Sequence, residues 1–238
     1  MQKLAIALAI VTASFTTQAS EWGYGDHNGP QEWGAISSIC ADGKNQSPIN
    51  VDKPLAAQME PMKLTYQGKV VSLLNNGHTL QAGVEGDNYL TVDGKRFDLL
   101  QFHFHTPSEN LIRSQQFPLE AHFVHADKDG NLAVVAVMFE INQENKALTQ
   151  LTGELPTSGS SVELAHAFDA SALLPKTDNY FRFNGSLTTP PCSEGVRWFV
   201  LEQPQTLSDS QEKALSTAMG KNNRPIQDLN ARKVMFSH

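Results

Sequence analysis

The sequence lacks the features of several protein classes. Lysine and arginine number 18 against 25 aspartate and glutamate residues, a formal net charge of −7. A nucleic-acid binder needs a basic footprint and a membrane-surface protein needs a polybasic segment, so both classes are disfavoured. Beyond residue 20 there is no membrane-length hydrophobic run, repeat or low-complexity segment. At 40% hydrophobic residues the chain is neither disordered nor collagen-like. We predict a soluble, mildly acidic globular protein with no nucleic-acid partner and no membrane span.

One unbroken apolar run, residues 4–11, lies near the N-terminus. Lys3 precedes this run, and small and polar residues follow it as far as Ala19. A basic residue, an apolar run and a small-residue site in this order are typical of a secretory signal peptide, and the run is too short to span a membrane. We predict a signal peptide over residues 1–19 and an exported mature domain over residues 20–238. The alternative is an uncleaved anchor.

Cysteine is scarce, since Cys40 and Cys192 are the only two. In an exported protein, two cysteines indicate a disulfide rather than free thiols or half of a metal site. The predicted Cys40–Cys192 bridge closes a loop of about 150 residues, which the chain-entropy model values at no more than roughly 5 kcal/mol.

Short β-rich runs dominate the remaining sequence, and turn signals such as Asn76-Gly77 and Asp93-Gly94 separate several of them. Ser208 with Gln211 resembles a capping box, and Gly220 stands where a helix would end. We predict a mainly β single domain with peripheral helices. The predicted strands are 69–74, 79–84, 88–92, 96–105, 119–125, 132–140, 180–183 and 196–201, and the predicted helices are 143–151 and 212–219.

Three histidines stand out by strand arithmetic. Alternation along a strand places Gln101, His103 and His105 on one face of the first run. The same rule places Glu120 and His122 together on a face of the second run. If the two strands are neighbours, the three imidazoles form an all-nitrogen site, which suits zinc and leaves a fourth position open for catalysis.

Three other interpretations of these histidines remain open. Ordinary hydrogen bonds could satisfy them without any metal. In a cupin-like metal oxygenase, Glu109 would join His103 and His105 as a ligand, but Gln116 stands where that motif needs glycine. A copper–zinc superoxide dismutase also uses two histidines on a β-scaffold, but the other histidines are too scattered to complete its site.

Several motifs together resemble the α-class carbonic anhydrases, and specifically their exported bacterial branch. The resemblance covers roughly residues 22–232, with Asp228 where a proline is expected. The motifs are Trp22-Gly23-Tyr24-Gly25, Asn45-Gln46-Ser47-Pro48-Ile49, Leu74-Asn75-Asn76-Gly77-His78, the runs 101–110 and 120–122, Ser186-Leu187-Thr188-Thr189-Pro190-Pro191-Cys192-Ser193-Glu194-Gly195 and Asn222-Asn223-Arg224-Pro225.

The resemblance implies a fold and an activity. The fold is a central, mostly antiparallel twisted sheet of about ten strands with short surface helices. The activity is the reversible hydration of carbon dioxide to bicarbonate and a proton by a zinc-bound hydroxide. By the same resemblance His103, His105 and His122 bind zinc, while the Gln101 side chain, the Glu120 carboxylate and the Asn222 backbone orient their rings.

The resemblance also assigns roles around the metal. Thr188 donates to Glu109 and orients the nucleophile, and His78 carries protons out of the site, a task that suits a histidine pKa near 6.5. The remaining expected site residues are Thr189 for bicarbonate, Val124, Val134, Leu187 and Trp198 for an apolar wall, and Tyr24, Asn76 and Gln81 for a proton path.

Expected partners are carbon dioxide and bicarbonate, with sulfonamide and anion inhibitors and a homodimer implied by resemblance alone. The resemblance to the exported bacterial branch favours a periplasmic location over full secretion. The non-enzyme alternative is a related binding protein that has lost activity. His125, on the face opposite His122, is expected in the core, whereas His27, His166 and His238 have no motif around them.

Overall fold

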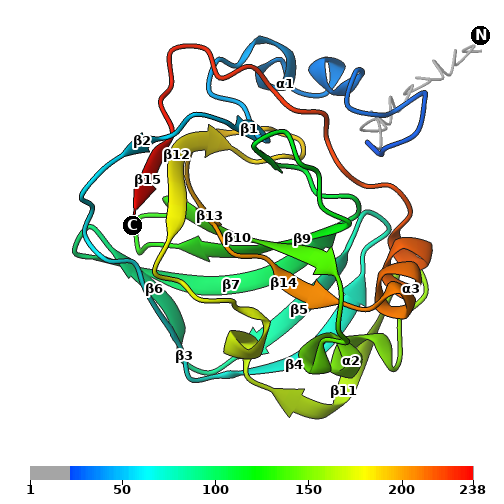
Figure 1. Ribbon diagram of the computed structural model, residues 1–238. Helices are drawn as coiled ribbons and strands as arrows, with labels where there is room; N and C mark the ends of the chain where they lie inside the picture. Colours follow the sequence, from blue (N-terminus) through cyan, green and yellow to red (C-terminus); the bar gives the residue numbers. More distant parts are fainter. Residues whose placement is uncertain (1–21, 238) are drawn as a thin grey trace, which may run out of the picture.

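A large twisted sheet forms the centre of the chain (Figure 1). It is seen in a computed structural model that describes residues 22–237. Ten strands follow one another in hydrogen-bonded order: β11 (Ser160–Phe168), β4 (Lys69–Asn75), β5 (Leu80–Glu85), β7 (Lys95–His105), β9 (Leu119–Ala126), β10 (Leu132–Ile141), β13 (Glu194–Leu201), β12 (Tyr180–Ser186), β15 (Met235–Ser237) and β2 (Leu55–Ala56). This path confirms the predicted sheet of about ten strands.

Three further strands join this sheet away from the main path, namely β3 (Lys63–Tyr66), β6 (Asn88–Val92) and β14 (Gln205–Leu207). A separate parallel pair consists of β1 (Asn50–Val51) and β8 (Leu111–Ile112). Pairing in the large sheet is mostly antiparallel, with β10–β13, β10–β14 and β15–β2 parallel. Our predicted strands omit β11 and all six of the two- to four-residue strands, because edge position and short length weaken the hydrophobic pattern.

Both predicted helices form, with shifted starts. The first is α2 (Lys146–Thr152), whose first turn is capped by the Asn145 side chain. The second is α3 (Asp209–Met219), which begins at the predicted Ser208–Gln211 capping box and ends before Gly220 at φ 67°. The two helices contact each other at one end of the sheet (Figure 1). Shorter helical turns are η1 (Trp33–Ala35), α1 (Ile39–Asp42) and η2 (Ala170–Leu173). Within residues 22–237, no helix is long and apolar enough to cross a membrane.

Strand alternation separates the core from the histidines. Phe102 and Phe104 of β7 are fully buried, and Phe102 stacks on Phe123 of β9 with 4.9 Å between ring centroids. These rings anchor the middle of the sheet on one face. Because successive side chains point to opposite faces, His103 and His105 project from the other face of the same strand.

The predicted disulfide is confirmed. Cys40 of α1 is bonded to Cys192, which follows β12, across 152 residues of sequence. The fully buried ring of Trp33 belongs to the same small cluster. The predicted signal peptide, residues 1–19, and His238 lie outside the described residues.

His125 is a core residue, as predicted. Its side chain is fully buried on β9, and its Nε2 lies 2.8 Å from the Tyr66 hydroxyl. Burial lowers the pKa of His125 from 6.5 to about 4. The unfolded chain therefore takes up this proton below pH 6.5, while the folded chain resists it until about pH 4.

This difference predicts a pH-dependent loss of stability. The contribution of His125 to the free energy of unfolding is complete above pH 6.5. It falls by about 3 kcal/mol as the pH is lowered to about 4. Urea unfolding of wild type and His125→Gln should therefore show a gap in unfolding free energy that narrows by about this amount between pH 7 and pH 4. The control Tyr66→Phe keeps the imidazole and should keep the pH dependence. An equal gap between wild type and His125→Gln at both pH values would contradict the prediction.

Candidate metal centre

The pairing of β7 with β9 brings the three predicted histidines together. In this antiparallel register His103 lies directly opposite His122, and His105 lies opposite Glu120. Each histidine offers one ring nitrogen, and these atoms all lie within 4.8 Å of one another. Across residues 22–237 this is the one group of three or more potential ligating side chains with such spacing, and Glu109 is outside it.

Each imidazole has a separate partner on its second nitrogen. Nδ1 of His103 lies 2.9 Å from Oε1 of Gln101, and Nδ1 of His105 donates to the carbonyl of Asn222 at 2.8 Å. Nε2 of His122 lies 2.9 Å from Oε1 of Glu120. Carbonyl and carboxylate oxygens accept hydrogen bonds, so these nitrogens carry the proton. The other nitrogen of each ring keeps a lone pair.

Burial keeps the three rings neutral. It lowers the pKa of each imidazole, and for His103 the neighbouring His105 and His122 lower the pKa further. Nε2 of His105 is buried without a hydrogen-bond partner among the described residues, and the only polar contact of Nε2 of His122 there is the close approach to Glu120. The three ring nitrogens that face one another each carry a lone pair, and the lone pair of His105 accepts no hydrogen bond from the described residues. Such a set of lone pairs matches the needs of a bound cation. Neutral imidazole nitrogens are the ligand type that suits zinc.

Two buried carboxyl groups lie behind the histidines. Oε2 of Glu120 accepts from the backbone amides of Glu109 and Asn110 at 2.6 and 2.8 Å, and Oε1 accepts from the Asn110 side chain at 2.7 Å. Burial raises the pKa of Glu120, and the hydrogen bonds from Asn110 oppose this. The Glu120 carboxyl is thus held firmly where it meets His122, and Asn110, which we did not predict, helps to hold it.

Glu109 is the second of these carboxyl groups. Its Oε1 accepts from the backbone amide of Arg224 at 2.8 Å, and its Oε2 lies 3.5 Å from Nε2 of His105. Burial raises the pKa of Glu109 well above its ordinary value, while the amide of Arg224 and a hydrogen bond with Thr188 lower it. The predicted Thr188–Glu109 pair is therefore in contact.

A cavity of about 150 Å³ opens onto His103 and His105. His78 lies at this cavity with its ring stacked on Trp22 at 3.8 Å between centroids. Eight of the predicted site residues line the cavity, together with Trp22 and Thr79, which we did not predict as site residues. The lining is Trp22, Tyr24, Asn76, His78, Thr79, Gln81, Gln101, His103, His105 and Thr189.

The predicted apolar wall lies beside the metal centre rather than in this lining. Val134 of β10 is paired with Val124 of β9 and with Trp198 of β13. Leu187 packs against the same hydrophobic cluster. The Trp198 ring stands 4.9 Å from the ring of His122, edge to face. The four residues therefore form one apolar group next to His122.

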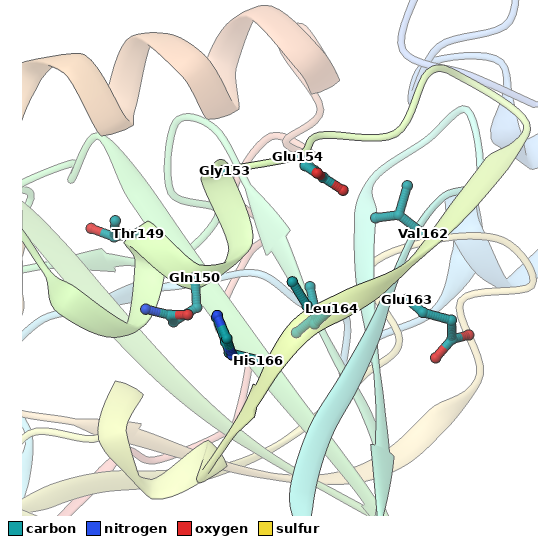
Figure 2. A pocket seen from close by; sticks show the side chains of 9 residues that line it. Thr149, Gln150, Gly153, Glu154, Val162, Glu163, Leu164 and His166 are labelled. Atoms are coloured by element: carbon teal, nitrogen blue, oxygen red, sulfur yellow. The ribbon is translucent and has the colours of Figure 1, made fainter.

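A second hollow, of about 240 Å³, lies between α2 and the edge strand β11 (Figure 2). It shares no lining residue with the histidine cavity. His166 lines it beside Gln150, but no group of metal-ligating side chains is found there within the described residues.

The sequence patterns do not identify Arg224 as a site residue, although it belongs to one of the resembling motifs. It is 2% exposed and its amide holds Glu109. A buried arginine has no signature in strand or helix periodicity. The Asn222-Asn223-Arg224-Pro225 motif was the available signal.

The fold and the site together define a class: a mainly β protein with three converging histidines, two of which line a cavity. The family profile of eukaryotic-type carbonic anhydrase matches residues 28–238. The chain belongs to that family, also called the α-carbonic anhydrases, and is an enzyme of it.

Similar proteins are bacterial members of the family. The chain is 42% identical to a carbonic anhydrase of Neisseria gonorrhoeae, over 99% of this chain and 97% of that protein. It is 53% identical to the α-carbonic anhydrase of Photobacterium profundum, with a TM-score of 0.89 over 90% of this chain and 100% of that one. It is 44% identical to the Thermovibrio ammonificans enzyme solved with sulfanilamide, with a TM-score of 0.88 over 90% and 98% of the two chains.

Proposed function

We propose that this protein catalyses the reversible hydration of carbon dioxide to bicarbonate and a proton, with zinc as its metal. The observation that carries the proposal is the convergence of three neutral imidazoles, two of them lining one cavity and each with its own partner. His103, His105 and His122 hold the metal. When bound, zinc supplies a water molecule whose pKa is lowered to about 7, as is well established for carbonic anhydrases, and with it a nucleophile at neutral pH.

Thr188 and Glu109 orient the nucleophile. One carboxylate oxygen of Glu109 already accepts the Arg224 amide, and the carboxyl also faces Thr188. When the Thr188 hydroxyl donates to Glu109, its oxygen is left as an acceptor toward the cavity. Thr188 then admits only a partner that donates a proton to it, which fixes the direction of the attacking lone pair. Thr189, which lines the cavity, contacts bicarbonate.

The apolar group beside His122 receives carbon dioxide. The substrate is apolar overall and forms few hydrogen bonds, so an apolar surface next to the nucleophile holds it without trapping it. Val124, Val134 and Trp198 are almost fully buried and pack with Leu187 on this side of the centre.

His78 moves the product proton out of the cavity. Its position at the cavity, with its ring against Trp22, suits a group that exchanges protons with buffer. Tyr24, Asn76 and Gln81 line the space between His78 and the metal centre and support a chain of water molecules there.

We further propose that residues 20–238 form one exported domain, with the periplasm as its compartment. The Cys40–Cys192 disulfide supports export.

The solved sulfanilamide complex of the Thermovibrio relative supports inhibition of this protein by sulfonamides, and a metal centre of this kind should also bind small anions. A homodimer remains part of the proposal.

Zinc removal and restoration test the activity itself. We expect stopped-flow measurements on the mature protein to show rapid carbon dioxide hydration that is lost with a zinc chelator and returns with one equivalent of zinc. Magnesium, which prefers oxygen ligands, should not restore it. A folded, zinc-loaded protein without hydration activity would favour the alternative of a binding protein.

The substitution Glu109→Gln separates this site from a cupin-like site. Because Glu109 orients rather than ligates, the variant should keep its zinc and lose about 10- to 100-fold in hydration rate. Glu163→Gln, at an exposed position, serves as the control and should keep both its zinc and the wild-type hydration rate. Release of zinc from the Glu109 variant, measured by elemental analysis, would instead make Glu109 a ligand.

Replacement of the proton carrier should slow turnover in a way that buffer can repair. We expect His78→Ala to lower kcat in weak buffer by about tenfold or more, and added imidazole to restore part of it. The variant His166→Ala, at an exposed position, should behave like wild type. An unchanged rate of His78→Ala in weak buffer would remove His78 from the mechanism.

A further inference from the structure

The side chain of Arg224 is a buried cation close to the metal centre. It is 2% exposed, and none of the ion pairs formed by residues 22–237 includes it. Burial of a charge without strong partners is costly, so the contacts of this guanidinium must compensate for lost water.

Those contacts come from one stretch of the N-terminal part of the chain. Nη1 of Arg224 donates to Oε1 of Gln46 at 2.9 Å and to the carbonyl of Ser47 at 2.8 Å, and Nη2 donates to the carbonyl of Cys40 at 2.8 Å. The guanidinium also lies 5.7 Å from the centroid of the Trp33 ring. One side chain thus joins the C-terminal segment to the segment that carries the disulfide.

The backbone of the same residue contacts the metal site. Its amide donates to Oε1 of Glu109 at 2.8 Å, and two residues earlier the carbonyl of Asn222 accepts from His105. A carboxyl group turns easily about its last bond, since that torsion has no strong preference. The Arg224 amide occupies one oxygen of Glu109 and so selects one orientation of the carboxyl.

We propose that Arg224 is a positioning residue for catalysis. Its guanidinium fixes the segment 222–224 against Cys40, Gln46 and Ser47, and this fixes the amide that directs Glu109 toward Thr188. The inference rests on the proposed function, because Glu109 acts on the reaction only if Thr188 orients the nucleophile. Arg224 contacts neither substrate nor metal, so its effect passes through Glu109.

The geometry also explains why arginine stands here. Three acceptors in different directions require a planar group with several fixed N–H donors. A lysine ammonium could reach only part of this set, and a methionine could fill the volume without donating at all. The series arginine, lysine, methionine therefore removes the contacts stepwise at nearly constant length.

The test compares Arg224→Met and Arg224→Lys with wild type, all zinc-loaded, for kcat/KM, bound zinc and thermal unfolding. We expect Arg224→Met to lose about tenfold or more in kcat/KM and Arg224→Lys to lose about threefold, with zinc still bound. Unlike the loss in His78→Ala, these losses should persist at every imidazole concentration. The matched control is Arg232→Met, because Arg232 likewise donates three hydrogen bonds, all of them to backbone carbonyls, and none of them reaches Glu109. It should keep the wild-type kcat/KM.

Wild-type kcat/KM in folded Arg224→Met would overturn the inference, and so would zinc loss that parallels the loss of activity. If the methionine variant does not fold, Arg224→Lys decides, and wild-type kcat/KM in that variant overturns the inference. A wild-type protein that binds zinc but does not hydrate carbon dioxide overturns the proposed function and this inference with it. A missing effect of substitution in an active wild type overturns this inference alone.

Discussion

The register between β7 and β9 is the constraint on which the site depends. It sets His103 opposite His122 and leaves His105 one pleat further along the same face. A slip of one residue would turn an imidazole into the core and a phenylalanine into the cavity, because side chains alternate. Phe102 and Phe104 resist such a slip, since both are fully buried on the opposite face. The hydrophobic core therefore positions the three histidines.

Burial by itself would leave the imidazoles poorly defined, and hydrogen bonds remove the ambiguity. Each ring has one nitrogen occupied by an oxygen acceptor, so the lone pair of the other is directed inward. The acceptors are themselves held. Glu120 accepts from the backbone amides of residues 109 and 110, and the side chain of Asn222 donates to the carbonyls of His78 and Phe104. The imidazoles are thus oriented by oxygen acceptors, and these acceptors are held in turn by a second set of hydrogen bonds, which involve Glu109 and Asn222.

The C-terminal segment connects parts of the chain that are distant in sequence. Within three residues it contacts His105, Glu109 and the disulfide-bearing segment. A short irregular stretch can do this because its backbone groups are not used in a sheet ladder. The buried Arg224 is consequently one of the links between the disulfide-bearing segment and the three histidines.

The sequence by itself determined the longer strands of the sheet centre, both main helices and the faces of the three histidines. Alternation in 101–105 and 119–125 was enough to place the histidines on faces, capping residues located α3, and the cysteine pair indicated the bridge. Strand alternation and helix capping depend on neighbours in sequence, which local rules describe, and the bridge followed from there being only two cysteines. The edge strand β11, the buried Arg224, the share of Asn110 in holding Glu120 and the position of the apolar group beside His122 were decided by tertiary structure. Each depends on contacts between residues far apart in the chain, and only the folded sheet brings those residues together.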